Sequence, residues 1–334
     1  MTDQADFALD LHRVAVPDPS QNACWSPFSV ACALALAREG ARGRTRAELD
    51  VLLSGFELGA ALEVPELALA AMLWADDGLA LNPGFPLASS VRRTAFSDHR
   101  TARELINAAV GEATRGLVPE LLGHVSPATV AVLVNALYLK VSWQRPFKAN
   151  ATKPRLFHAP GGDVEVPTME VAARLGHAHR NGWRTVVLPA RSGVEVLVLL
   201  PDESLDQPLG ASAFDVDDSA GITLLLPKVD VREKFELSDV LERVGVGTMF
   251  SAGADFTGLS PDHLVVSEVV HEAVLRVDER GLEGAAATAV VMTRGARSRP
   301  PVDPVLVHVD RPFLLVVRHA ESKAVYFLAQ VAHP

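Results

Sequence analysis

The sequence of 334 residues predicts an α+β fold, in which helices and strands occupy separate stretches of the chain. Helical patterns dominate the first part and strand patterns the remainder, without the regular alternation that builds a doubly wound parallel sheet. With 49% hydrophobic and 22% charged residues, the chain can bury a sizeable core. No internal repeat, low-complexity tract or linker divides it, so we expect a single domain over residues 1–334.

The first helices follow from side-chain spacing and from capping residues. Apolar side chains recur at helical spacing over residues 7–14. Ser26 followed by Pro27 is a typical helix start, with a hydroxyl at the N-cap and a proline in the first turn. The nearly all-apolar run that follows predicts a buried helix that ends near Gly40.

Two further helices are expected before the strands begin. Thr45 and Glu48 have the spacing of a capping box, which predicts that a helix starts at Thr45. Residues 106–122 have a helical pattern that is broken near Gly116 and Pro119.

The strand patterns begin at residue 128. Residues 128–139 form a continuous apolar run after turn signals, which indicates a strand buried on both faces, although periodicity alone leaves a helix open. Further strand patterns lie at residues 185–188, 194–200, 222–226, 269–277, 305–309, 313–318 and 325–331.

Charge and composition exclude several classes of protein. The net charge of −10 disfavours nucleic-acid binding, because such a field repels phosphates. Two cysteines, Cys24 and Cys32, cannot form a disulfide framework. The longest stretch without a charged residue, 121–139, contains glycine, histidine, proline and asparagine, so we expect no membrane span. The N-terminus has no secretory-signal pattern.

The familiar catalytic motifs are missing from the sequence. There is no GxSxG elbow and no phosphate-binding loop of the Walker type. His271 and Glu272 begin like a zinc helix, but Leu275 stands where the second histidine belongs. His177 and His179 could meet a metal as a pair, yet such pairs are usually solvated. We therefore expect a protein that is not an enzyme, with no cofactor and no metal.

The stretch from Gly281 to Ala296 has an unusual composition. It reads GLEGAAATAVVMTRGA, with alanine, threonine and valine where a loop usually has turn residues. From Leu282 onward, one alternating set of side chains suits a core and the other a shallower face, as in a strand. An ordinary strand or helix made of small residues would have the same pattern.

Five motifs, in order along the chain, resemble those of the serpin family. They are NACWSPFS at 22–29, VNALYLK at 134–140, VHEA at 270–273, DERGLEGAAATAV at 278–290, and DRPF at 310–313 together with FLAQV at 327–331. The resemblance implies a serpin fold with three β-sheets, eight or nine helices and an exposed reactive-centre loop. A composition rich in alanine, leucine and valine suggests a prokaryotic member.

The resemblance also implies a mechanism and assigns a hinge and a shutter. A cleaved reactive loop enters the main sheet as a new strand, and the protease stays bound as an acyl-enzyme. Leucine at 282 and glycine at 284 depart from the usual threonine and alanine, but neither is a charge or a proline, so insertion is still expected. The hinge residues would be Glu279, Gly281, Leu282, Glu283, Gly284, Ala285, Ala286 and Ala287. The shutter residues, under the centre of the main sheet, would be Ser26, Ser29, Asn135 and His271.

The reactive bond is located by counting along the loop. From Glu279, the family's usual length leads to the bond between Gly295 and Ala296. Because the distal part of this loop looks long, the candidates are Met292, Thr293, Arg294, Gly295 and Ala296. Arg294 would suit a trypsin-like pocket, whereas Met292 or Thr293 would suit chymotrypsin-like or subtilisin-like serine proteases, which we expect as partners in a covalent complex.

Three functions stay open at this point. The first is a suicide inhibitor of serine proteases, monomeric and with neither nucleic-acid nor membrane partners. The second is a non-inhibitory serpin-fold protein that acts as a binding or chaperone-like module. The third is a hydrolase whose catalytic triad leaves no sequence signal. An SDS-stable complex with a protease would separate the first from the other two.

Overall fold

A computed structural model describes residues 4–54, 56, 64–126, 129–216, 218–282 and 304–334. The α-helices in this part of the chain are α1 (Gln4–Ala15), α2 (Pro27–Gly40), α3 (Gly43–Leu52), α4 (His99–Ala113) and α5 (Ser238–Arg243). Short 3-10 helices are η2 (Ala88–Ser90), η3 (Ala149–Ala151), η4 (Ala211–Phe214) and η5 (Thr248–Phe250).

The larger sheet has nine strands, in the order β1-β14-β13-β8-β7-β6-β9-β12, with β5 paired to β6. Their bounds are β1 (Ala23–Trp25), β5 (Lys153–Ala159), β6 (Gly162–Arg180), β7 (Trp183–Pro189), β8 (Val194–Pro201), β9 (Ser219–Pro227), β12 (Val305–His308), β13 (Phe313–His319) and β14 (Val325–Val331). The 19-residue β6 pairs with β5 over residues 162–168, with β9 over 168–176 and with β7 over 176–180, so it joins all three strands into one hydrogen-bonded sheet.

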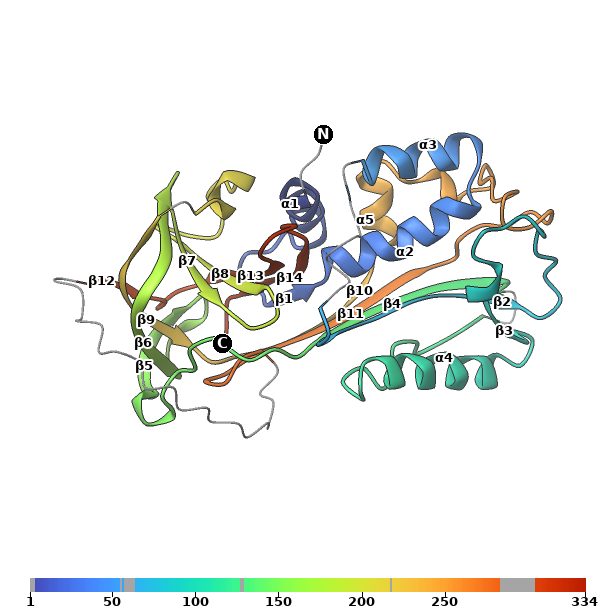
Figure 1. Cartoon of the computed structure of the whole chain (residues 1–334). Helices are drawn as coiled ribbons and strands as arrows, with labels where there is room; N and C mark the ends of the chain where they lie inside the picture. Colours follow the sequence, from blue (N-terminus) through green and yellow to red (C-terminus); the bar gives the residue numbers. More distant parts are fainter. Residues whose placement is uncertain (1–3, 55, 57–63, 127–128, 217, 283–303) are drawn as a thin grey trace.

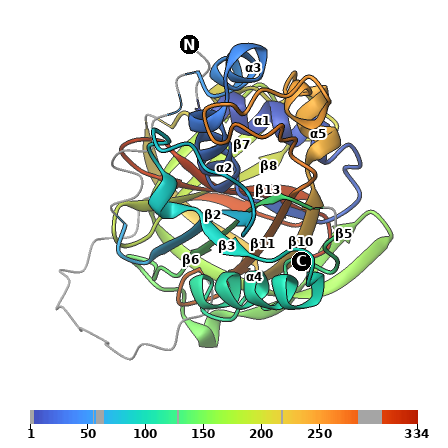
Figure 2. The same ribbon diagram turned by 90° about the vertical axis from the view of Figure 1, so that its right-hand side faces the viewer.

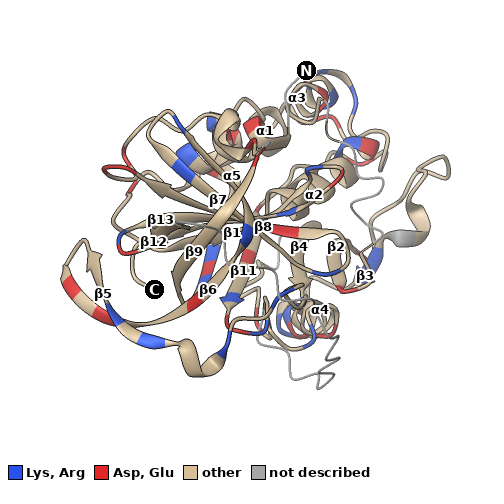
Figure 3. Cartoon of the chain, turned by 60° about the vertical axis from the view of Figure 1, so that its left-hand side comes forward, with Lys and Arg blue, Asp and Glu red and all other residues tan. Residues whose placement is uncertain are grey.

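The smaller sheet has five strands, in the order β10-β11-β4-β2-β3. Their bounds are β2 (Leu67–Asp76), β3 (Arg92–Thr94), β4 (Ala131–Leu139), β10 (Val229–Glu236) and β11 (Val269–Val277). In the centre of this sheet, β4 and β11 are parallel neighbours, although most other pairs are antiparallel. No Lys, Arg, Asp or Glu lies on β4, which is tan throughout in Figure 3.

Helices cover both faces of the five-stranded sheet. Figures 1 and 2 show α4 on one face and α2, with α3 beyond it, on the other. On the α4 face, Ile106 and Val110 pack in one apolar cluster with Val134 and Val270 of the two central strands. Because both faces are covered, the central strands are apolar along nearly their whole length, as the run at 128–139 predicts.

The start and end of α2 confirm the prediction made from its capping residues. Ser26 is the N-cap, and its hydroxyl accepts a hydrogen bond from the Ser29 amide at 3.0 Å. The helix ends at Gly40, where a Cβ would lie 2.8 Å from the Cβ of Leu259. Only glycine leaves room for this close approach.

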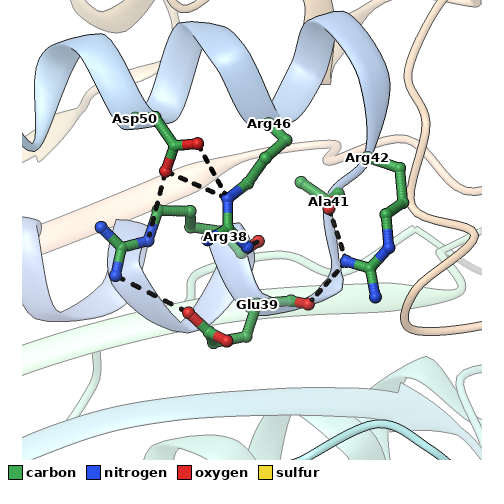
Figure 4. Close-up of polar contacts among 6 residues, drawn as sticks. All are labelled: Arg38, Glu39, Ala41, Arg42, Arg46 and Asp50. Carbon is green, nitrogen blue, oxygen red and sulfur yellow. Dashed lines mark hydrogen bonds and ion pairs between the residues drawn. The ribbon is translucent and has the colours of Figure 1, made fainter.

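Charged side chains tie α2 to α3, as Figure 4 shows. The carboxylate of Asp50 accepts hydrogen bonds from Arg46 Nε at 3.0 Å and lies 3.8 Å from Arg38 Nε. Arg46 also donates through Nη1 to the Arg38 carbonyl at 2.9 Å. These contacts hold the C-terminal part of α2 against α3.

Two helix predictions are wrong in their details. The helix α3 begins at Gly43, and Thr45 and Glu48 do not cap it. The hydroxyl of Thr45 accepts from the Asp255 amide instead, and the Glu48 carboxylate accepts from Thr248, so long-range contacts win over a local capping box. The pattern at 106–122 belongs to α4, which begins earlier at His99, capped by Asp98, and ends at Ala113.

The α+β prediction is confirmed, and the strand patterns at 185–188, 194–200, 222–226, 269–277, 313–318 and 325–331 all fall within strands. The pattern at 128–139 contains β4, which begins only at Ala131, and the pattern at 305–309 contains β12, which ends at His308. Sequence reasoning missed β2, whose LALAAMLWAD has alanines that lower its strand signal. Hydrogen bonding divides the described strands into two sheets because β6 is continuous, whereas the resemblance implied three.

Candidate functional site

The seam between β4 and β11 differs from the other strand pairs of its sheet. On one side, β4 pairs with β2 over nine residue pairs, from Leu67–Leu139 to Ala75–Ala131. On the other side, β4 pairs with β11 over four pairs, from Val269–Leu133 to Glu272–Ala136. Beyond Glu272 and Ala136 the ladder stops, although both strands continue. We call this stretch, residues 273–277 and 137–141, the open half of the seam.

The chain closes the far end of the open half by turning back on itself. After β11, the Asp278 amide donates to the Gly281 carbonyl at 3.0 Å, which makes a tight turn. The Asp278 carboxylate accepts from the Arg280 amide at 2.8 Å and stabilises this turn. Leu282 then forms a bridge with Val277 on one side, and its amide donates to the Val141 carbonyl at 2.9 Å on the other.

Leu282 therefore lies between the two central strands. Its side chain is 1% exposed and belongs to the same core cluster as Val277 and Val141. Gly281 makes this path possible, because a Cβ there would lie 2.1 Å from the Val141 carbonyl oxygen and 2.7 Å from Ser142 Cα. Of the predicted hinge residues, Glu279, Gly281 and Leu282 are described, and all three lie at this end of the seam.

The segment after β4 holds the turn in place. The Trp143 indole donates to the Asp278 carbonyl at 2.8 Å, and the Trp143 amide donates to the Arg280 carbonyl at 2.9 Å. The Phe147 amide donates to the Glu279 carbonyl at 2.9 Å. Because Trp143 is 1% exposed, these hydrogen bonds are shielded from water and restrain the turn strongly.

Glu279 is fixed by two polar side chains. Its carboxylate lies 2.9 Å from Lys228 Nζ and accepts from the Thr152 hydroxyl at 2.7 Å. Burial by itself raises the pKa of Glu279, but the hydrogen bonds from Lys228 and Thr152 outweigh it and hold the pKa below its usual value. Glu279 is therefore ionised and joins the turn to the connection between β9 and β10 and to the residue that follows η3.

The paired end of the seam holds a buried polar cluster. The Ser26 amide donates to His271 Nε2 at 2.8 Å, so Nε2 has no proton and Nδ1 carries it. His271 Nδ1 then donates to Asn135 Oδ1 at 2.5 Å, and the Ser29 hydroxyl donates to the same oxygen at 3.3 Å. All four side chains are fully buried. The structure thus brings together the four residues predicted for the shutter.

His271 is neutral in this cluster. Burial lowers its pKa to about 3, although the contact with Asn135 works in the opposite direction. The Asn135 Nδ2 atom is buried and has no hydrogen-bond partner among the described residues. A buried donor without a partner costs free energy, so this atom is a weak point of the closed seam.

Several predicted site residues lie outside the described residues. They are the hinge residues Glu283, Gly284, Ala285, Ala286 and Ala287, and the reactive-bond candidates Met292, Thr293, Arg294, Gly295 and Ala296. Their assignments stay predictions.

Sequence reasoning did not assign roles to Thr152 or Lys228. Lys228 stands between the apolar strand β9 and the alternating strand β10. A lysine in a short connection between strands is usually a solvated surface residue, so the sequence carries no signal for its contact with Glu279.

Two kinds of site were also sought among the described residues. They bring no group of three or more His, Cys, Asp or Glu side chains together in a way that could hold a metal ion. Within the same residues, no helix is long and apolar enough to cross a membrane.

Comparison with known proteins gives consistent matches over the full chain. The family described as Serpin (serine protease inhibitor) matches residues 2–334. Serpin A3-1 of Bos taurus is 32% identical over 367 aligned residues, which cover 98% of this chain and 88% of the relative. Human thyroxine-binding globulin, solved with its hormone, has a TM-score of 0.85 at 25% identity and covers 100% of this chain and 98% of its own. Tengpin, a thermophilic serpin solved in its native state, has a TM-score of 0.86 at 23% identity, covers 100% of this chain and 94% of its own, and so supports the fold alone.

Proposed function

The chain belongs to the serpin family, and from this premise we propose that it is an irreversible, suicide-type inhibitor of serine proteases. Family membership supports protease inhibition in general. The mechanism proposed for this chain rests on one observation above all: two central parallel strands lack a ladder over the open half of their seam, with Leu282 between them at its end. A new strand can enter there without first breaking a ladder.

The reaction starts as an ordinary proteolysis. The protease serine oxygen attacks the carbonyl carbon of one peptide bond within residues 292–296. An ester forms between the serine oxygen and that carbonyl, the C–N bond breaks, and the new amine leaves with a proton. The segment after Leu282 then enters the seam as a strand antiparallel to both neighbours. Because the acyl group is carried along with it, the protease is displaced before water can hydrolyse the ester.

One factor makes insertion thermodynamically favourable, and a second makes it fast. Each new backbone hydrogen bond contributes ~0.5–1.5 kcal/mol, and the seam offers unpaired groups on both strands. Small side chains, such as those of Ala285, Ala286 and Ala287, pass easily between strands that are being parted. Entry can then compete with deacylation.

The decisive assay measures covalent trapping. The chain is incubated with chymotrypsin, trypsin and subtilisin, and the products are separated under denaturing conditions. We expect an SDS-stable complex with at least one of the three, together with a large rise in thermal stability of the cleaved chain. Cleavage by all three without any complex, and without a gain in stability, would contradict the proposal.

A second candidate function is the binding of a small amphipathic molecule without inhibition. The observation that favours it is a cavity of about 270 Å³ between α1, the segment 205–209 and the nine-stranded sheet. Apolar side chains line most of it, and polar groups are contributed by His12, Arg13, Asp206, Gln207 and Gln330. Thyroxine, the ligand named for the human relative, is a suitable probe. Quenching of Trp183 fluorescence on titration, lost in Arg13→Ala, would support this function.

A further inference from the structure

One edge of the long strand β6 is paired at both ends and unpaired in between. On that edge, β5 pairs with residues 162–168 and β7 with residues 176–180. Residues 169–175 have no strand partner there among the described residues, although β9 pairs with all of them on the opposite edge. The gap arises because β7 stays with β8 as far as Pro189, whereas β6 follows β9.

Hydrogen bonds just beyond the β6–β9 ladder show which backbone groups point into this gap. The His177 amide donates to the Asp218 carbonyl at 3.0 Å. At the other end, the Pro167 carbonyl accepts from the Lys228 amide at 2.9 Å. In an antiparallel pair, successive residues direct their backbone groups to opposite edges, so the odd-numbered residues of β6 face β9. The residues that direct N–H and C=O groups into the gap, without a backbone partner among the described residues, are Glu170, Ala172 and Arg174.

A cavity of about 220 Å³ lies beside the gap, where β7 leaves β6. The strand β6 lines it with Val171, Ala173 and Leu175, and the other side is lined by Leu188 of β7 and by Trp143. Leu175, Leu188 and Trp143 are buried, so the inner wall of the cavity is apolar. An apolar side chain from outside would gain free energy by entering it.

Two arginines give this cavity a positive charge. Arg145 and Arg174 are exposed, and both line it, together with no acidic residue of the described part of the chain. Neither forms an ion pair with a described residue, and Arg174 uses only Nε, which donates to the Ser219 hydroxyl at 2.9 Å. Glu170, at the far end of the gap, is bound by Arg155 at 3.0 Å. Two unpaired guanidinium groups in a chain of net charge −10 favour an anionic ligand.

We infer that this gap binds the carboxyl-terminal end of another protein, as a short added strand whose last side chain is apolar. The unpaired groups of β6 bond the main chain of the guest, and the cavity receives its last side chain. The two arginines bind the terminal carboxylate, so the guest runs parallel to β6 and ends beside Arg174. A chain end suits this gap better than an internal segment, because β7 resumes pairing at Gly176 and blocks a longer strand.

Peptide binding tests the choice of a chain end. Fluorescein-labelled hexapeptides that end in Val-Thr-Leu, Val-Thr-Val or Val-Thr-Phe are titrated with the full chain and followed by fluorescence anisotropy. We expect saturable binding of at least one free acid, and amidation of its carboxylate should weaken binding about tenfold, because a charge-assisted contact is lost. Extension by Gly-Ser should abolish binding. Equal affinity of the free, amidated and extended peptides, or no saturable binding of any free acid, would overturn the inference.

Two variants separate strand addition from simple attraction of an anion. Ala172→Pro removes an amide that faces the gap and leaves the β9 side intact, so we expect roughly two- to tenfold weaker binding. Arg174→Ala should weaken binding about tenfold, whereas the matched control Arg100→Ala, at an exposed position on α4, should not change it. If Ala172→Pro has no effect and dodecanoate displaces the peptide, the guest is a lipid-like anion and strand addition is wrong.

Hydrogen exchange on the wild type tests the open edge without any variant. In the free chain, the amides of Ala172 and Arg174 should exchange faster than those of Val171 and Ala173, which face β9. Saturation with the free-acid peptide should slow exchange at Ala172 and Arg174 and leave the other two amides unchanged. Equal exchange of all four amides in the free chain would show that the edge is closed. None of these measurements depends on protease trapping, so the proposed function and this inference fail separately.

Discussion

The two sides of β4 show how one sheet combines a permanent seam with one that can part. Toward β2 the strand has nine antiparallel pairs, and toward β11 it has four parallel pairs followed by an open half. Both sides are buried and apolar, so hydrophobic burial does not distinguish them. The difference lies in the hydrogen bonds and in what holds each end.

The β4–β11 seam is held at its ends by specific polar contacts. Trp143 and Glu279 secure the hinge end, and the cluster of Asn135 and His271 secures the paired end. Such contacts break one at a time, whereas a long ladder opens cooperatively. The comparison predicts that variants at these ends will change the behaviour of the seam, and that equally severe variants on the β2 side will not.

The largest effect is expected from removing a buried tryptophan on each side. Trp143→Ala at the hinge end and Trp74→Ala on β2 should each cost about 3–5 kcal/mol of unfolding free energy, because both side chains are buried. Only Trp143→Ala should also speed exchange of the Leu282 amide. The measurements are urea unfolding and hydrogen exchange on the same samples.

Phenylalanine variants sharpen this result. Trp143→Phe loses the hydrogen bond to the Asp278 carbonyl, whereas the Trp74 indole nitrogen has no partner among the described residues. Trp143→Phe should therefore speed Leu282 exchange and Trp74→Phe should not. If both tryptophan sites affected Leu282 equally, the two seams would not be distinct.

An intermediate effect is expected from pH. The folded-state pKa of His271, about 3, lies below the ordinary value of 6.5, so between these values the unfolded chain binds a proton that the folded chain does not. Stability should thus fall as the pH drops below 6.5, by up to about 1.4 kcal/mol per pH unit. Above pH 6.5 the residue has no such effect.

A second histidine provides the control for this prediction. Burial lowers the pKa of His12 to about 4, and His12 lies in the last turn of α1 rather than at the seam. Urea unfolding at several pH values should show a shallower acid slope in both His271→Gln and His12→Gln. Only His271→Gln should also change the exchange rates of β11 amides. An unchanged acid slope in His271→Gln would contradict a neutral, buried His271.

The smallest effect is expected from the ion pair at the hinge end. Lys228 is 41% exposed and its partner Glu279 is 14% exposed, so water screens the pair on one side. Lys228→Met should cost about 0.2–1 kcal/mol, and added salt should reduce the difference from the wild type. Thr152→Val, which removes a neutral partner of Glu279, should show no salt dependence. A loss above ~2 kcal/mol in Lys228→Met would show that this contact dominates the hinge end.

Much of the fold follows from local patterns in the sequence. The N-cap at Ser26 predicts α2, and the strand pattern at 269–277 predicts β11. The apolar run at 128–139 predicts β4, because burial on two faces leaves a continuous apolar signature. The capping box at Thr45 fails, since both of its side chains bond to distant backbone or side-chain groups.

The sequence by itself determined which elements exist in the centre of the molecule and which polar residues lie within them. A histidine and an asparagine inside apolar strands need partners, and that need is visible in one dimension. Only the tertiary structure decided how far β4 and β11 pair and that Leu282 lies between them. Those features depend on the distance between two parallel strands more than a hundred residues apart, which no local pattern encodes.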